Sequence, residues 1–468
     1  MSGPRGIRAV VALLAAVGVV VGADHLLPAV APAAALAQST ERRPLSAATL
    51  VCPDVAEDGA GPRSTKISFS SDSSGGTVTA HWLQSGAQET SYDGSSQVQT
   101  LPEQTHNFGG VVLTAAGNAA AGFTAGLTSR YDAGSTAGTA AVQCAAPTTN
   151  AYFVGPATTT GHDPRLVLVN PDPSPANVDV AIAEDGKPFS PESTRGIALP
   201  GYGTTTVALV DVAPEQAAVA IHVQTRSGRV TAVVRDRWYN GSLPLGVDWL
   251  SGGAAPGKDL VLPGIGGTDS NVTLVLASQS ADAGTVVAEA RNASGSFTPA
   301  GLQSIDVAAG AIVRVTVPKS ALGSGGALHV TSDVPVLAAA ASVRADTAKT
   351  PRPDFAWTPA GVPLTGPVSP PPGGTQMILT SATDTAVDFT SPTMHLSLTV
   401  TAGTSVSVSM SVLGEGVLVV PKDPGVLYAA VVNAPIGSGG ALAVSGLVTP
   451  ARTIVVLPAR PDIFLGSR

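Results

Sequence analysis

Short runs of alternating apolar and polar residues follow one another along most of the chain. Val, Ile and Thr dominate these runs, and Gly or Pro residues separate one run from the next. Examples are the segments Ala176–Ile182, Thr204–Val210 and Ile312–Val317. In an extended chain this alternation turns every second side chain toward a core and the others toward solvent. The pattern predicts an all-β protein built of short strands joined by tight turns.

The predicted strands recur in the same order along the chain, which indicates duplication of a β unit. The clearest matches pair Leu166–Val169 with Val272–Leu276, Pro200–Gly201 with Ala309–Gly310, and Val230–Arg235 with Val336–Arg344. The predicted parts are a signal segment at 1–37, β units at 48–148, 149–252, 258–360 and 376–468, and a Pro/Gly linker at 365–375. In the last unit we interpret Leu413–Val432 as an insertion that adds a hairpin.

Tandem Ig-like β-sandwiches are the fold that this organisation favours. About six or seven strands per unit, with turn residues between them, are typical of such sandwiches. Independent sandwiches bury their own cores and contact only their neighbours in the sequence. A β-propeller is the alternative, because the segment around Phe464 resembles the segments that open the units and could close a ring.

The N-terminus has the layout of an export signal. Arg5 and Arg8 precede the uncharged run Ala9–Ala23, and Ala35–Ala37 resembles a cleavage site. An uncleaved signal anchor is the alternative to a cleaved signal peptide. Both place the folded body outside the cytoplasmic membrane. The protein is then secreted or anchored, with membrane contact only through this segment if it is uncleaved.

The two cysteines of the chain are Cys52 and Cys144. In an exported protein two cysteines most simply form a disulfide, here one that would clamp the first β unit. Metal binding is a poorer alternative, because two thiols without a nearby group of histidines leave the coordination incomplete.

Several segments together resemble a known family. The export segment is followed by Leu50–Pro53, and further segments fit the same pattern, namely Leu166–Pro171, Pro200–Gly201 and Gly228–Val230. In these features the chain resembles an actinobacterial family of secreted proteins known only as a domain of unknown function (DUF). The resemblance covers nearly the whole mature chain. The family has no established activity or catalytic residues, so the resemblance assigns no role to any residue of this chain.

The charge pattern argues against nucleic acid as a partner. The formal net charge is −8, only 12% of the residues are charged, and no stripe of Lys and Arg occurs. Phosphate backbones are bound by clustered cations, which this chain lacks. The chain also has no nucleophile elbow, and its seven histidines have no ligand spacing. No catalytic residue, metal site or cofactor is predicted.

Carboxylates near the ends of predicted strands are the remaining candidates for chemistry. They are Asp236, Asp248, Asp346, Asp354 and Asp462. A glycosidase needs two carboxylates about 5–10 Å apart across a cleft, but the recurrence of these residues from unit to unit favours a structural role. Asp54, Glu57 and Asp58 could form a calcium loop, although the alternating ligand pattern is missing.

Trp238, Trp249 and Trp357 are candidates for stacking against a glycan, together with Tyr202 and Tyr239. Three of these rings cluster at unit junctions, so packing in a core or interface is the favoured interpretation. The function predicted overall is a non-catalytic cell-envelope protein that acts as a scaffold or binds an unknown envelope protein or glycan. The alternatives are a cell-wall carbohydrate-binding protein and an envelope hydrolase whose site is built from loops.

Overall fold

The computed structural model describes residues 41–55, 63–83, 88–134, 136–187, 194–266, 270–344, 353–414, 416–434 and 441–456. Strands dominate these residues, which confirms the all-β class. The helical segments among them are single turns, η1 (Gly117–Ala120), α2 (Leu209–Val212), η2 (Lys319–Ala321) and α3 (Met410–Leu413). In the described part of the chain no helix is long and apolar enough to cross a membrane. The predicted signal segment at 1–37 lies outside the described residues.

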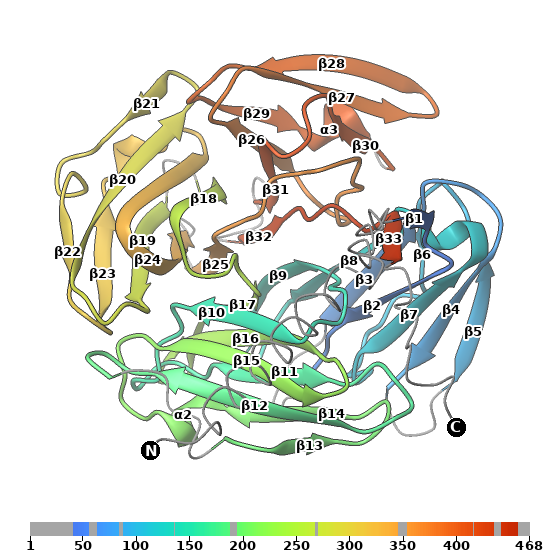
Figure 1. Cartoon of the computed structure of the whole chain (residues 1–468), viewed down its shortest axis with the longest axis horizontal. Coiled ribbons are helices and arrows are strands. Elements are labelled where there is room, and N and C mark those ends of the chain that lie inside the picture. The colour runs from blue at the N-terminus through green and yellow to red at the C-terminus, as the bar shows by residue number, and fades with distance from the viewer. Residues whose placement is uncertain are drawn as a thin grey trace, which may run out of the picture. The chain divides into compact units, whose positions relative to one another are not determined.

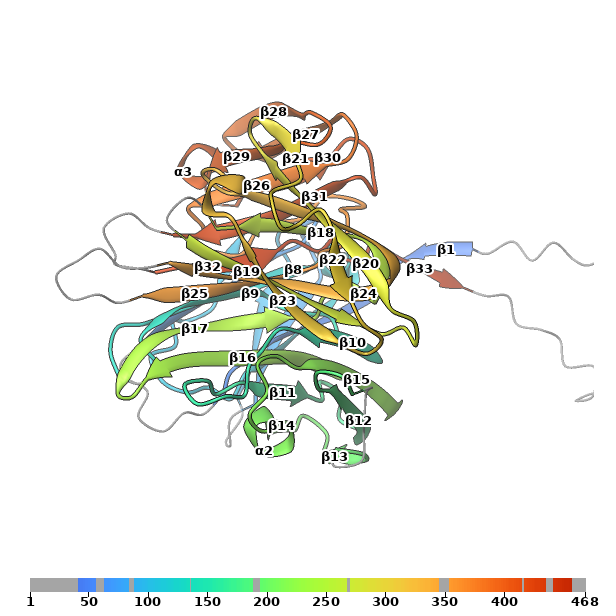
Figure 2. The same cartoon turned by 90° about the vertical axis from the view of Figure 1, so that its left-hand side faces the viewer.

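Contacts divide the chain into two compact units. The smaller unit contains the antiparallel ribbon of β1 (Glu41–Pro44) and β33 (Thr453–Val456), in which Glu41 pairs with Val456. Figure 2 shows these two strands side by side. The larger unit runs from Leu45 to Arg452. Its strands fall into four consecutive sets, which we call the first to fourth strand groups.

The first strand group forms two sheets with the orders β2-β7-β4-β5 and β6-β3-β8-β9. Its strands are β2 (Ala47–Cys52), β3 (Arg63–Ser70), β4 (Thr77–Trp82), β5 (Glu89–Asp93), β6 (Gln99–Thr100), β7 (Val111–Ala116), β8 (Thr124–Tyr131) and β9 (Gly138–Gln143). All pairings within these sheets are antiparallel.

The second strand group repeats this arrangement with the orders β10-β15-β12-β13 and β14-β11-β16-β17. Its strands are β10 (Asn150–Val154), β11 (Arg165–Val169), β12 (Ala176–Ala183), β13 (Ile197–Leu199), β14 (Thr204–Ala208), β15 (Ala220–Ser227), β16 (Thr231–Asn240) and β17 (Leu243–Ser251). Buried and partly exposed residues alternate along β12, as the sequence pattern predicts.

The third strand group differs because one long strand belongs to both of its layers. β24 pairs through its first half with β18 and β20, and through its second half with β19 and β25. The strands are β18 (Gly257–Ile265), β19 (Ser270–Ser278), β20 (Gly284–Asn292), β21 (Gly295–Phe297), β22 (Ile305–Val307), β23 (Ile312–Val317), β24 (Gly326–Arg344) and β25 (Asp354–Pro359).

The fourth strand group has the orders β29-β26-β31-β32 and β28-β27-β30. Its strands are β26 (Gln376–Ser381), β27 (Thr385–Ser391), β28 (Met394–Val400), β29 (Ser405–Ser409), β30 (Leu418–Pro421), β31 (Leu427–Asn433) and β32 (Ala443–Gly446). β30 and β31 hold the places that β15 and β16 hold in the second group. The interpretation of Leu413–Val432 as an insertion is therefore wrong, because this stretch supplies two strands of the common arrangement.

The last strands of the four groups meet inside the larger unit. β9 contacts β17, β17 contacts β25, β25 contacts β32, and β32 contacts β9. Figure 1 shows these four strands toward the middle. The circuit of contacts thus closes between the first and fourth groups. Independent sandwiches would contact only their neighbours in the sequence. That expectation is wrong here, because the strands that end the sheets pack against one another and cover their free edges.

Neighbouring groups also share hydrophobic cores. The core of the first group includes Val167, Val233 and Trp249 from the second. The core of the second includes Phe355 and Trp357 from the third. A propeller blade is a single sheet, whereas the first, second and fourth groups each divide their strands between two sheets. The Ig-like assignment and the division into four domains stay predictions.

Candidate functional site

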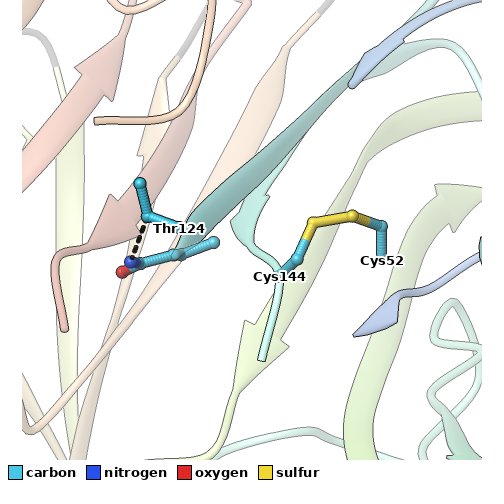
Figure 3. Close-up of a disulfide and its surroundings, with 4 residues drawn as sticks. Cys52, Thr124 and Cys144 are labelled. Carbon is cyan, nitrogen blue, oxygen red and sulfur yellow. Dashed lines mark hydrogen bonds between the residues drawn. A yellow bond between two sulfur atoms is a disulfide. The ribbon is translucent and has the colours of Figure 1, made fainter. Parts of the chain in front are cut away.

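The structure contains a disulfide between Cys52 and Cys144, the pair that the sequence predicts. Figure 3 shows the bond, whose two Cα atoms lie 4.5 Å apart. Cys52 ends β2 in one sheet of the first group, and Cys144 follows β9 in the other. Both residues are buried. The bond therefore ties the two sheets of this group together across 92 residues of sequence.

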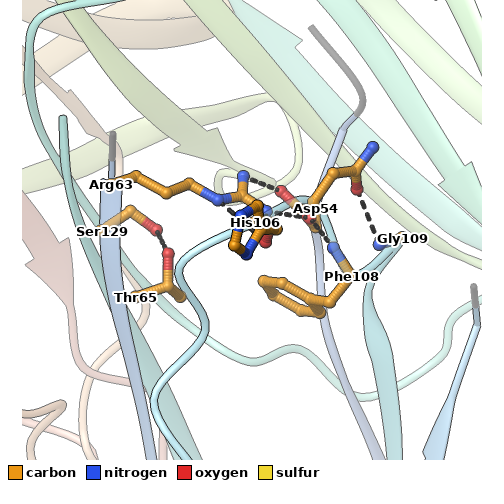
Figure 4. Close-up of polar contacts among 8 residues, drawn as sticks. Asp54, Arg63, Thr65, His106, Phe108, Gly109 and Ser129 are labelled. Carbon is orange, nitrogen blue, oxygen red and sulfur yellow. Dashed lines mark hydrogen bonds and ion pairs between the residues drawn. The ribbon is translucent and has the colours of Figure 1, made fainter. Parts of the chain in front are cut away.

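Asp54 is held by a buried arginine and does not have the surroundings of a calcium ligand. The Arg63 guanidinium donates to both carboxylate oxygens of Asp54 at 2.8 Å. The backbone N–H of Phe108 donates to the same carboxylate at 2.7 Å, and Arg63 also bonds the carbonyl of His106 (Figure 4). Glu57 and Asp58 lie outside the described residues. No metal-binding cluster of His, Cys, Asp and Glu occurs in the part described.

Asp354 joins all four strand groups at the centre of the larger unit. It begins β25 of the third group, and its Oδ2 accepts hydrogen bonds from the backbone N–H of Thr139 at 2.7 Å and of Leu442 at 3.1 Å. These donors belong to the first and fourth groups, and Val247 of the second donates as well. Gly246 makes room for the carboxylate, since a Cβ there would lie 2.2 Å from Asp354 Oδ1.

Two further buried carboxylates satisfy donors beside Asp354. Asp248 on β17 accepts the backbone N–H of Trp357 at 2.7 Å. Asp236 on β16 accepts the indole N–H of Trp238 at 2.8 Å and that of Trp357 at 3.0 Å. Asp236 and Asp248 have no exposed surface, and Asp354 is 1% exposed. The three residues act as acceptors for donors that the meeting strands would otherwise bury unpaired.

Burial shifts the titration of these three groups. Desolvation raises the pKa of Asp236 to about 6, although hydrogen bonds from Trp238 and Trp357 oppose the shift. Desolvation also raises the pKa of Asp248 and of Asp354 well above the ordinary value, against the lowering effect of their backbone donors. Each carboxyl therefore holds its proton to a higher pH than a solvent-exposed aspartate does.

The buried carboxylates are not arranged as a hydrolase site. Perturbed acids in a cleft would indicate catalysis, but Asp236 and Asp248 are fully enclosed. Asp354 borders a hollow of about 50 Å³ between Arg130, Thr139 and Ala441, far smaller than a sugar-binding cleft. Asp346 and Asp462 lie outside the described residues. The structure thus brings three of the five candidate aspartates together, in a core.

The tryptophans proposed for glycan stacking lie in the same core. Trp249 and Trp357 are 3% and 2% exposed. Trp238 is partly buried and stacks on Phe355 with 4.0 Å between ring centroids. A stacking platform needs ring faces that a sugar can reach, so Trp249 and Trp357 do not form one. Their surroundings are those of the core-packing interpretation. Tyr202, 39% exposed, stacks on His81, and Tyr239 lies near the Arg237 guanidinium.

The contact between the first and fourth groups, which we call the closing seam, is mostly polar. The segment Ser369–Gly374 lies along β8, where Thr128 Oγ1 donates to the carbonyl of Pro372 at 2.6 Å. Gln143 exchanges two bonds with the backbone of Val448, at 2.7 and 3.0 Å. The Arg452 guanidinium donates to both oxygens of Asp72 and to the carbonyl of Pro367.

A cavity of about 930 Å³ opens along this seam. Its walls come from both groups, and most lining side chains are neutral. One wall contains Lys66, Ser68, Val98, Thr100 and Glu103 from the first group; the floor and other wall contain Pro370–Gln376, Ser409–Ser411, Gly414, Gly416 and Ala434. Among the described residues, the charged ones that line it are Lys66 and Glu103. The part of the lining that the structure describes contains no aromatic ring.

The family match covers most of both the centre and the seam. The Family of unknown function (DUF5719) matches residues 95–412. The chain belongs to this family. The DUF5719 region begins before β6 and ends within α3, so it includes the complete second and third groups. Curated proteins give no match to the chain.

The seam cavity is the feature that sequence reasoning missed. The lining residues at 98–103 and 370–411 lie within the DUF5719 match. They become neighbours only because the first group contacts the fourth. The Pro/Gly segment Thr365–Thr375 was the available signal, and its composition predicts a semi-rigid spacer. A stiff segment serves equally well as the floor of a cavity when another sheet lies against it.

Proposed function

We propose that this protein is a non-catalytic extracytoplasmic cell-envelope protein that binds a partner in the seam cavity. The observation that carries the proposal is the contrast in access. The buried carboxylates are enclosed, whereas the cavity offers about 930 Å³ of open space, lined mostly by neutral side chains. Cavities of roughly 300–1,000 Å³ are the usual size of ligand sites.

Two features support a location outside the cytoplasm. The sequence of residues 1–37 has the layout of an export signal or anchor. A disulfide joins Cys52 and Cys144, and structural disulfides persist in oxidising compartments.

The glycan-binding and hydrolase alternatives have less support. Sugar sites commonly use accessible aromatic faces, and none occurs among the described residues that line the cavity. A hydrolase needs acids that touch substrate, whereas Asp236 and Asp248 have no exposed surface. Each alternative has its own test. A glycan-binding protein would bind purified cell-wall glycan, and a hydrolase would release soluble sugar from it.

The test uses two serines of β29 that are both exposed. Ser409 lines the cavity and Ser407 is outside its lining. We expect Ser409→Arg to block capture of the native partner by cross-linking in intact envelopes, because a long charged side chain enters the cavity. Ser407→Arg should leave capture unchanged. Equal capture by wild type and both variants would refute the seam as the binding site.

A further inference from the structure

We propose that the partner enters the seam cavity as an extended polypeptide segment that adds as a strand to the free edge of β6. This inference rests on the proposed function and names the chemical class of its ligand. β6 is the terminal strand of the sheet β6-β3-β8-β9, and no described strand pairs with its outer edge. Adding a strand to a free sheet edge is an established mode of peptide recognition.

The hydrogen bonding of β6 shows which backbone groups face the cavity. Leu101 donates its N–H to the carbonyl of Ile67 at 2.9 Å. Thr100 is opposite Ser68 in the same register. Successive residues of an antiparallel strand direct their N–H and C=O groups to opposite edges, so those of Thr100 point away from β3. Thr100 and Val98, the two residues with this orientation, are also the residues nearest this edge that line the cavity.

The chemistry of the cavity suits a polypeptide better than the other polymers of an envelope. Val98, Pro371 and Met410 supply apolar contact for alternate side chains of an added strand. Among the lining residues that the structure describes, Lys66 and Glu103 contribute one charge of each sign. The described lining residues offer no aromatic ring on which a sugar could stack.

The equivalent strand of the second group provides an internal control. β14 also ends its sheet, in the order β14-β11-β16-β17. Asn170 donates to the carbonyl of Gly203 and Leu209 donates to that of Pro164, so the backbone groups of Thr206 point to the outer edge. Thr206 and Thr100 are both exposed threonines at this position. Only Thr100 lines the seam cavity.

The experiment removes a single outward-facing backbone N–H, either from β6 or, as the control, from β14. Proline is tolerated on an edge strand where its missing N–H would face outward, so Thr100→Pro should leave the sheet intact. The probe is a linear heptapeptide selected from a random library on wild-type protein and synthesised with blocked ends. We expect Thr100→Pro to weaken binding of this peptide about ten-fold, the effect of losing one hydrogen bond of roughly 1.4 kcal/mol. Thr206→Pro should change binding less than two-fold.

A second measurement protects the test against a folding defect in Thr100→Pro. The same peptide, N-methylated at alternate residues, is titrated against wild-type protein. Methylation in one register should abolish binding and methylation in the other should not, because only one set of N–H groups faces β6. Equal binding by both methylated peptides, equal effects of the two proline variants, or a library that yields no peptide competing with the partner would overturn the inference.

The outcomes separate the two proposals. If Ser409→Arg blocks partner capture while Thr100→Pro and N-methylation have no effect, the cavity binds its partner without strand addition. The inference then falls and the proposed function stands. If Ser409→Arg also has no effect, both fall.

Discussion

The junctions between consecutive strand groups and the closing seam are built from different interactions. Consecutive groups share apolar cores, as where Phe355 and Trp357 pack among second-group residues or Ile378 and Ala430 pack on Ala356. The closing seam instead relies on side chain to backbone hydrogen bonds and on the pair of Arg452 with Asp72. Apolar burial stabilises by about 25 cal/mol per Å², whereas surface ion pairs contribute little. We therefore expect that separating the groups at the seam costs less free energy than separating them at any other junction of the larger unit.

This difference assigns separate roles to the two regions. The centre holds the groups together and excludes water from its carboxylates. The seam leaves polar backbone accessible and contains the cavity. Binding surfaces are commonly found in the less stable parts of a protein, and here that part is the boundary between the first and fourth groups.

Deletion of residues 375–468 tests the whole comparison and has the largest expected effect. It removes the fourth group, exposes Ala356 in the shared core, and deprives Asp354 of the Leu442 donor. We expect the fragment to melt about 10 °C lower or more, or to aggregate through exposed strand edges. Deletion of residues 457–468 alone is the control. Cooperative melting of the large-deletion fragment at the wild-type temperature would show that the closed circuit contributes no stability.

Asp354→Ala tests the centre alone. The substitution leaves the buried N–H groups of Thr139, Leu442 and Val247 without their acceptor. Each unsatisfied buried donor costs about 1–3 kcal/mol, so we expect a loss of roughly 3 kcal/mol or more in the free energy of unfolding. Urea titration measures it. Asp172→Ala, which removes a partly exposed partner of Arg229, is the control and should cost far less.

The pH dependence of stability sharpens the picture of the same region. The folded protein raises the pKa of Asp236 to about 6 from an ordinary 3.8. The native state thus binds this proton more tightly than the unfolded chain does. The resulting stabilisation is complete below pH 3.8 and is lost as the pH rises through about 6.

We expect the free energy of unfolding to fall as the pH is raised from 4 toward 6, with a contribution from Asp236 of up to about 1.4 kcal/mol per pH unit. His162 and His222 act in the opposite direction, because burial lowers their pKa. Asp236→Asn isolates the effect, since it removes the titration and keeps an acceptor for the two indoles. A wild-type slope identical to that of Asp236→Asn would contradict the assignment.

Local features could be predicted from the sequence far better than the arrangement of the groups. The alternation along β12 and the Cys52–Cys144 pair depend on short-range pattern and compartment chemistry, and both occur in the structure. The recurrence of aspartates near strand ends, Asp354 among them, indicated a structural role. The contacts of Asp354 with Thr139 and Leu442 could not be predicted, because they depend on which strand edges meet. Leu413–Val432 was misassigned because its strands match the repeat weakly.

The smallest expected effect concerns the seam and its ion pair. Arg452 and Asp72 are 25% and 29% exposed, and two nitrogen–oxygen contacts at 2.5 and 2.8 Å join them. A partly exposed pair near the surface contributes about 0.5–1 kcal/mol, so Arg452→Ala should change the melting temperature only slightly. The same variant also frees the carbonyl of Pro367, and amide exchange should therefore accelerate in β8 and in residues 367–374 while the β25 amides stay protected. Arg229→Ala, which breaks a similar bidentate pair with Asp172 inside the second group, should leave exchange at the seam unchanged. Equal acceleration in β25 and β8 would show that the seam does not open separately from the centre.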